Sequence, residues 1–162
     1  KVILGGADSK IFNSEGYVFW SPGMKLKIVT HQWGANLNKG FETYKLLDEM
    51  LESPKWKNLI EFTYIGNLPK NFKFNNTRII KPLSGIDLSN EIKKSHIYVT
   101  GSINEPSGNH HIEAAQCGLP ILYINSGGIP EYCNNYGVIY ELESFEEKLN
   151  YVIKNSYNLW VY

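Results

Sequence analysis

The sequence predicts an α/β fold of the Rossmann-like, doubly wound type, built on a mostly parallel six-stranded sheet. Short apolar, β-branched runs alternate with stretches of helical period, which is the pattern of repeated β-α units. In such sheets, ligands bind beyond the carboxyl ends of the strands, near the switch in strand order. Strands are expected at 26–30, 61–65, 77–80, 96–100, 121–124 and 137–140.

Helices are expected between these strands. Residues 41–51 place apolar side chains at three- and four-residue steps, which makes one helical face. Ser53-Pro54 is expected to end that helix. Further helices are expected from Ser84, capped together with Asp87, to Lys94, from about Gly108 to Cys117, over 129–133, and from a Ser144–Glu147 capping box onward.

Composition argues against several classes of protein. With 43% hydrophobic and 20% charged residues, the chain reads as an ordinary soluble globular protein. Sixteen basic residues balance sixteen acidic ones, so no overall field favours a nucleic-acid partner, although local positive charge can still act. No segment reaches the roughly 20 apolar residues of a membrane span. Two cysteines, Cys117 and Cys133, are too few for a disulfide framework, and a reducing, cytoplasmic setting is expected.

Residues 1–23 do not fit the strand–helix alternation. Their glycines and aromatic residues predict an irregular lead-in from a missing N-terminal half, followed by one domain over 24–162. The chain begins at Lys1 and no signal peptide pattern opens it. A piece of a longer protein is therefore expected.

The strongest functional pattern is the run EPSGNHHIEAAQCG, which starts at Glu105. Glu105 ends a loop that leaves a strand, and Glu113 lies eight positions later inside a helix. Gly108, Asn109 and His110 then lie at the helix N-terminus, where unpaired backbone N–H groups attract an anion. An anion cradle between two carboxylates suits a nucleotide diphospho-sugar. On the pattern alone, an acid that complements the helix dipole and a solvated Glu113 stay an open alternative.

This run resembles the Glu, seven residues, Glu signature of retaining GT-B glycosyltransferases, the glycosyltransferase group 1 family. Residues 113–120 (EAAQCGLP) resemble the family's EAMACGxP run, and residues 126–131 (SGGIPE) resemble its GGxPE segment. Lys39-Gly40, after a strand and before a helix, is similar to its KG motif. The ordered set implies the C-terminal, donor-binding half of a GT-B fold.

The resemblance implies a role for each matched residue. Glu105 would hold donor-sugar hydroxyls, and the amides of residues 108–110 would hold the distal phosphate. Glu113 would bind the ribose hydroxyls. Lys39 would neutralise the diphosphate, a role that suits the compact charge of a lysine and the stabilisation of a developing oxyanion.

Two further positions match less closely. Leu83 follows a strand end where this family usually binds the base, and Gly128 opens a helix that would face the sugar. A strand-to-helix loop and a tight turn explain both without a ligand, so this alternative stays open. The family's arginine, about five residues before the lysine, is absent; His31 or Asn36 is expected to supply a donor instead.

No metal or cofactor is expected, because the nucleotide-sugar is a substrate. His110 and His111 are adjacent on a helix and point roughly 100° apart, so they cannot face one ion as an i, i+4 pair does. One of them is expected to line the site and the other to pack against the sheet. His96 is expected to be a satisfied core or edge histidine.

The function expected is transfer of a hexose, with retained configuration, from a UDP- or GDP-sugar to a glycan or lipid-linked acceptor, as in polysaccharide biosynthesis. The partner would be the missing N-terminal acceptor domain, so the chain alone is expected to bind without transferring. The full-length protein is expected in the cytoplasm, with association with the cytosolic face of a membrane left open. The alternative is a non-catalytic nucleotide-binding or regulatory GT-B half.

No GxGxxG follows the first strand and no GxxxxGK[ST] occurs, which argues against dehydrogenases and P-loop proteins.

Overall fold

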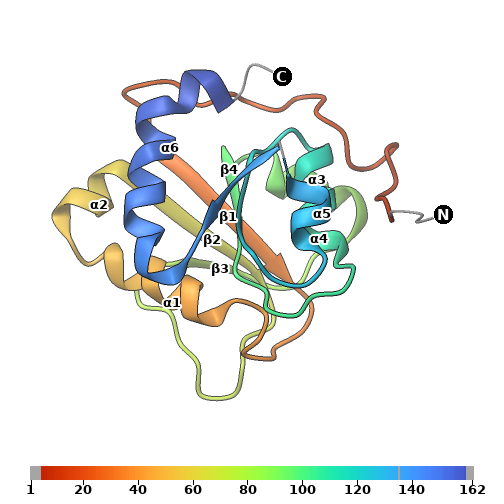
Figure 1. Ribbon diagram of the computed structural model, residues 1–162, viewed down its shortest axis with the longest axis horizontal. Helices are drawn as coiled ribbons and strands as arrows, with labels where there is room; N and C mark the ends of the chain where they lie inside the picture. The colour runs from red at the N-terminus through yellow and green to blue at the C-terminus, as the bar shows by residue number, and fades with distance from the viewer. Residues whose placement is uncertain (1–4, 135, 160–162) are drawn as a thin grey trace.

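Six strands form one sheet in the order β3-β2-β1-β4-β5-β6, and every neighbouring pair is parallel (Figure 1). The computed structural model describes residues 5–134 and 136–159. The sheet is fully parallel, where the sequence predicted a mostly parallel one. The strand order reverses between β1 and β4, so a crevice is expected beyond their carboxyl ends. The strands are β1 Leu26–Gln32, β2 Ile60–Gly66, β3 Arg78–Ile80, β4 Ile97–Thr100, β5 Ile121–Ile124 and β6 Gly137–Tyr140.

Helices cover both faces of the sheet (Figure 1). One face carries α1 (Phe41–Met50), α2 (Pro54–Leu59) and the closing helix α6 (Phe145–Leu159). The opposite face carries the helices α3, α4 and α5, because right-handed crossovers place them there once the strand order reverses. These three helices are α3 Gly85–Ile92, α4 Asn109–Gln116 and α5 Ile129–Cys133.

Each face has its own apolar core. Leu26 and Ile28 of β1 belong to the core under α1, α2 and α6, whereas Val29 belongs to the core under α3, α4 and α5. This change of side along one strand follows from the period of two in a β-strand. Among the described residues, no helix is both long and apolar enough to cross a membrane.

The sequence prediction missed helix α2, and the capping box that it placed before α6 is not observed, although α1 ends and α6 begins close to the predicted positions. Pro54 begins α2 instead of only ending the preceding helix, because a proline is well tolerated in the first turn, where its missing N–H has no partner to lose. The Ser144–Glu147 capping box does not form. The Ser144 hydroxyl instead accepts a hydrogen bond from the backbone N–H of Glu141 (3.2 Å), inside a short 3-10 turn over Leu142–Ser144.

The lead-in is irregular, with no strand or helix between residues 5 and 25. It packs against α3 and α4. Phe12 is buried in the second core, Ser89 of α3 donates to the carbonyl of Ile11 (2.7 Å), and the Ala7 N–H donates to Gln116 of α4 (2.9 Å). Residues 1–4 lie outside the described residues, and the boundary at residue 23 stays a prediction.

A loop replaces the helix that would normally join β2 to β3. The carboxylate of Asp48, on α1, accepts the backbone N–H groups of Asn75, Asn76 and Thr77, each at 2.8 Å, and the Thr77 hydroxyl at 2.6 Å. Asp48 is buried, so these bonds satisfy both the carboxylate and the turn of the loop into β3. One side chain therefore holds the edge strand in place.

Replacing Asp48 with alanine should destabilise the fold by about 2–4 kcal/mol, because three backbone donors and one hydroxyl would lose a charged acceptor. Chemical denaturation of the variant measures this loss directly. Glu49→Ala, at the neighbouring exposed position, is the matched control and should change stability little. An Asp48→Ala protein as stable as that control would show that the loop does not depend on this carboxylate.

His96 should make the fold sensitive to acid. Its Nδ1 accepts the backbone N–H of Lys27 (3.0 Å), and burial, aided by the charge of Lys27, lowers its pKa to about 4. Between about pH 6.5 and pH 4 the unfolded chain binds a proton that the folded one does not, so the free energy of unfolding falls on acidification, by about 3 kcal/mol at most for this residue.

The histidine-specific part is measured with His96→Asn, which keeps an acceptor for Lys27 but does not titrate. Urea unfolding at several pH values should give this variant a shallower dependence on pH than the parent. Equal slopes for the two proteins would mean that His96 does not carry this effect.

Candidate functional site

Two loops meet beyond the carboxyl ends of β1 and β4, at the switch in strand order. Lys39 forms an antiparallel bridge with Ser102, and the N–H of Ile103 donates to the carbonyl of Asn38 (2.7 Å). Backbone hydrogen bonds thus join the loop that carries Lys39 to the loop that carries Glu105. The sequence could not show this pairing, because the two loops lie more than 60 positions apart.

Glycines allow this close approach. A Cβ atom on Gly40 would lie 2.8 Å from the carbonyl carbon of Gly101, and one on Gly101 would lie 2.5 Å from the hydroxyl of Thr43. Gly40 also has a φ of 97°, which favours glycine. The glycine after Lys39 is therefore required by backbone contact, whatever ligand the lysine binds.

Lys39 and Glu105 form an ion pair through the Lys39 Nζ and the Glu105 Oε2. The Lys39 side chain is 30% exposed and that of Glu105 is 12% exposed, so the pair lies at the mouth of the site. Asn104, with a φ of 56°, turns the chain immediately before Glu105. Asparagine tolerates this left-handed conformation better than most residues.

The turn at Gly127-Gly128 packs against the backbone of the Glu105 loop and holds it in place. A Cβ atom on Gly127 would lie 2.3 Å from the carbonyl oxygen of Glu105. The N–H of Gly128 donates to that same carbonyl (2.8 Å), and the Ser126 hydroxyl accepts the N–H of Asn104 (2.9 Å). The Gly128 amide thus serves the Glu105 loop in this structure, and its contact with a donor stays a prediction.

The N-terminus of α4 lies beside Glu105. Gly108 is the N-cap residue, no side chain caps the helix, and its first turn contains no acid. A Cβ atom on Gly108 would lie 2.8 Å from Cγ of Glu105 and 2.6 Å from Nδ1 of His110, so glycine is needed here too. The first-turn N–H groups, starting with that of Asn109, make this helix end a natural place for an anion.

The second carboxylate is paired as well. Nε2 of His31, at the end of β1, lies 2.8 Å from Oε2 of Glu113. His31 is buried, and its Nδ1 has no hydrogen-bond partner among the described residues. The hydroxyl of Tyr98 accepts the His31 N–H (3.1 Å) and donates to the His31 carbonyl (3.2 Å). His31 therefore orients Glu113 from a strand end that is itself held in place.

The two adjacent histidines on α4 are neutral. His110 Nε2 lies 3.0 Å from the Thr100 hydroxyl, and burial lowers the pKa of His110 well below its ordinary value. Burial also lowers the pKa of His111 to about 4; its ring packs against Tyr132, with centroids 5.3 Å apart, and neither ring nitrogen has a hydrogen-bond partner in the described part of the chain. Within the described chain, no three His, Cys, Asp or Glu side chains are grouped to hold a metal ion.

Leu83 also lies at the carboxyl edge of the sheet, near the ends of β1 and β2. It lines a small recess at the ends of β1 and β2 together with His31, Gln32, Trp33, Ile65 and Pro82. The recess therefore adjoins the His31–Glu113 pair. Whether Leu83 contacts a base stays a prediction.

Buried tyrosine hydroxyls form hydrogen bonds with residues at the carboxyl ends of β1 and β4, and the sequence did not reveal this role. The Tyr44 hydroxyl accepts bonds from Thr30 (3.1 Å) and Gln32 (3.3 Å), and the Tyr140 hydroxyl donates to the carbonyl of Thr100 (3.1 Å). Burial raises the pKa of Tyr44, so its phenol stays protonated at neutral pH. In the sequence Tyr44 is one member of an apolar helical face, and only the fold places its hydroxyl under the strand ends.

Solved structures share this fold at low sequence identity. The C-terminal domain of the glycosyl transferase group 1 family protein LpcC from Francisella tularensis is 16% identical with a TM-score of 0.68, over 96% of this chain and 91% of that one. Sucrose-phosphate synthase from Thermosynechococcus elongatus is 15% identical with a TM-score of 0.65, over 91% of this chain and 43% of that one.

A third similar structure is the α,α-trehalose-phosphate synthase (UDP-forming) from Burkholderia vietnamiensis, 8% identical with a TM-score of 0.58, over 75% of this chain and 33% of that one. The chain thus spans well under half the length of the two synthases. These likenesses show the fold, which is that of one half of a GT-B glycosyltransferase.

A search of the curated proteins found no match. The family model of glycosyl transferases group 1 matches residues 63–159, more than half of the chain. The matched part contains Glu105 and Glu113, and their contacts with Lys39 and His31 connect it to the β1 edge. The chain belongs to the glycosyl transferases group 1 family.

Proposed function

We propose that the chain is the donor-binding half of a retaining glycosyltransferase and binds a UDP- or GDP-linked sugar at the carboxyl edge of its sheet. One observation carries the proposal: the Lys39–Glu105 and His31–Glu113 pairs flank the uncapped N-terminus of α4. A diphosphate fits the helix end, and sugar and ribose hydroxyls fit the two carboxylates.

Lys39 would change partners when the donor binds. In this structure the charge of Lys39 is neutralised by Glu105. A diphosphate on the amides of Gly108, Asn109 and His110 would offer Lys39 a more highly charged partner. Glu105 would then be free to accept hydrogen bonds from hydroxyls of the donor sugar.

Glu113 would keep its partner. His31 bonds to one carboxylate oxygen, which leaves the other to accept a ribose hydroxyl. His31 stands near the place of the arginine that this family usually carries, but its observed contact is with Glu113. In this chain it therefore acts by orienting Glu113.

The reaction would proceed without a protein nucleophile, a metal ion or another cofactor. Lys39 and the α4 amides would stabilise the leaving diphosphate, which is where negative charge develops. That diphosphate would assist attack by the acceptor on the same face of the sugar, so the configuration is retained.

The acceptor site would belong to a companion N-terminal domain. Transfer of a hexose to a glycan or lipid-linked acceptor, in polysaccharide biosynthesis, is the activity we propose for the longer protein. We place that protein in the cytoplasm, and its association with the cytosolic face of a membrane belongs to the same proposal. The chain alone would bind the donor without transferring the sugar.

A non-catalytic nucleotide-binding or regulatory half is the second candidate. The observation that favours it is that Lys39 and Glu105 neutralise each other and that no arginine assists the lysine. A domain of this kind would bind a nucleotide but stabilise the leaving group poorly.

Calorimetric titration of the chain with UDP, GDP and their sugar conjugates should find one preferred nucleoside diphosphate over NAD and ATP. A ligand at about a hundred times its dissociation constant should stabilise the fold by about 2.7 kcal/mol. Lys39→Ala should weaken binding roughly 10- to 150-fold through loss of a charged hydrogen bond, and Glu113→Ala should abolish binding of the preferred nucleotide by removing its ribose contact. Lys45→Ala, an exposed lysine on α1, is the matched control; binding that Lys39→Ala and Lys45→Ala affect equally would contradict the proposed site.

Donor hydrolysis and transfer by the longer protein containing both domains should separate the two candidate functions. A catalytic half predicts turnover that Glu105→Gln and Lys39→Ala each reduce by about two orders of magnitude or more, since both act on the reacting end of the donor. Nucleotide binding with no turnover of any donor would favour the non-catalytic half.

A further inference from the structure

At the amino ends of β1, β2 and β3, on the side of the sheet away from the proposed donor site, one face of the sheet is exposed to solvent. Lys27 of β1 and Glu61 of β2 are partners in register, and so are Thr63 of β2 and Arg78 of β3. They point away from the first core, because they alternate with its apolar residues along the strands. Arg78 reaches α3 on that second face, where it pairs with Glu91.

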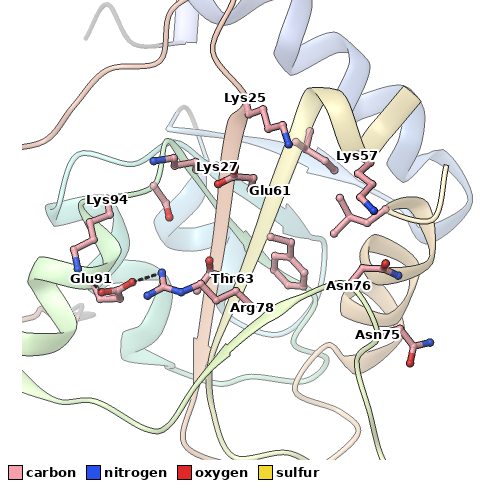
Figure 2. A pocket seen from close by; sticks show the side chains of 14 residues that line it. Lys25, Lys27, Lys57, Glu61, Thr63, Asn75, Asn76, Arg78, Glu91 and Lys94 are labelled. Atoms are coloured by element: carbon pink, nitrogen blue, oxygen red, sulfur yellow. Dashed lines mark hydrogen bonds and ion pairs between the residues drawn. The ribbon is translucent and has the colours of Figure 1, made fainter. Parts of the chain in front are cut away.

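An open groove of about 580 Å³ lies over this part of the sheet (Figure 2). Its volume falls within the range of small-molecule sites. Five cations from four segments of the chain line it. They are Lys25, which precedes β1, Lys27 on β1, Lys57 on α2, Arg78 on β3 and Lys94, which follows α3.

The groove carries more positive charge than its own carboxylates neutralise. The Glu91 carboxylate forms ion pairs with both Arg78 (2.7 Å) and Lys94 (2.6 Å), so one negative charge faces two positive charges. The three remaining lysines of the lining form no ion pair with any carboxylate among the described residues, and Glu61 is the one other acid in the lining. Five cations therefore face two carboxylates on a chain whose formal net charge is zero.

We propose that this groove is a second anion-binding site that takes phosphate groups, carried by a soluble phosphate ester or by a lipid headgroup. A lysine ammonium is a compact charge that suits phosphate, and an arginine can contact phosphate oxygens through two N–H groups. The positive excess is local to the groove, because the chain as a whole carries no net charge.

The site is separate from the proposed donor site. Lys27 and His31 lie four residues apart on β1, roughly 13 Å along the strand, and Val29 between them is buried in the second core. The groove lies at the amino ends of β1, β2 and β3, whereas Lys39, Glu105 and Glu113 lie beyond the carboxyl ends of the strands or on α4. The inference therefore does not depend on the function proposed above.

Titration of the ¹⁵N-labelled chain with inorganic tripolyphosphate, followed by amide NMR shifts at about 0.1 M salt, tests the proposal. Amides of Lys27, Thr63, Arg78 and Lys94 should shift together. The triple variant K25Q/K27Q/K57Q should weaken this binding at least about tenfold, because each lysine near a phosphate surface contributes on the order of 1 kcal/mol. Shifts near Gly108 and Glu113 would report the donor site separately and should be the same in both proteins.

The matched control is K45Q/K70Q/K73Q, which removes three exposed lysines elsewhere and should leave the groove shifts unchanged. Thermal unfolding checks that both triple variants are folded. If K25Q/K27Q/K57Q does not fold, the single variants K25Q and K57Q are tested instead, and each should show a smaller loss of tripolyphosphate affinity. No shifts at the groove amides, or equal binding by the parent and K25Q/K27Q/K57Q, would overturn the proposal.

Vesicles distinguish the two sources of phosphate. Cosedimentation with phosphatidylcholine vesicles that contain phosphatidylserine, but not with phosphatidylcholine alone, would assign a lipid headgroup if K25Q/K27Q/K57Q loses it. Binding of tripolyphosphate at the groove without binding to either vesicle would assign a soluble phosphate ester.

Discussion

The geometry of the carboxyl edge depends on backbone packed directly against backbone at glycines. Gly127 packs against the Glu105 carbonyl, Gly128 packs against the Pro106 carbonyl, and Gly40 packs against Gly101. A side chain at Gly127 would have to lie inside van der Waals contact, so the two loops could not approach. These contacts position Glu105 before any ligand is present. The GGxPE-like and KG-like segments thus have a structural role that is independent of their proposed ligand contacts.

The charged groups of the site form pairs. Lys39 neutralises Glu105, and His31 bonds to Glu113, so neither carboxylate is left as an isolated, partly buried charge, which would be costly. Around them the site stays neutral, because burial keeps His110 and His111 uncharged. In the proposed binding mode, a diphosphate would therefore enter at the N-terminus of α4, which no side chain caps, and compete for Lys39.

The two edges of the sheet differ because helices cover them unequally. Both faces are closed toward the carboxyl ends, where buried tyrosines such as Tyr98 and Tyr140 hydrogen-bond to the backbone of β1 and β4. Toward the amino ends of β1, β2 and β3, the alternation of apolar and charged residues leaves Lys27, Glu61 and Arg78 exposed on the second face, and the groove that they line extends to Lys57 of α2 on the first face. The same period of two that builds the first core thus exposes the groove.

The six strands in chain order, the position of α4 and the Glu105–Glu113 spacing could be predicted from the sequence, because these depend on local periodicity and on glycines that end or begin elements. The sequence could not show that Pro54 opens a helix, that Ser144 bonds back to Glu141, or that Asp48 holds the loop between β2 and β3. Nor could it pair Lys39 with Glu105 or His31 with Glu113. Those contacts join residues more than 60 positions apart, and only the parallel sheet, by bringing the ends of β1 and β4 together, decides which side chains meet.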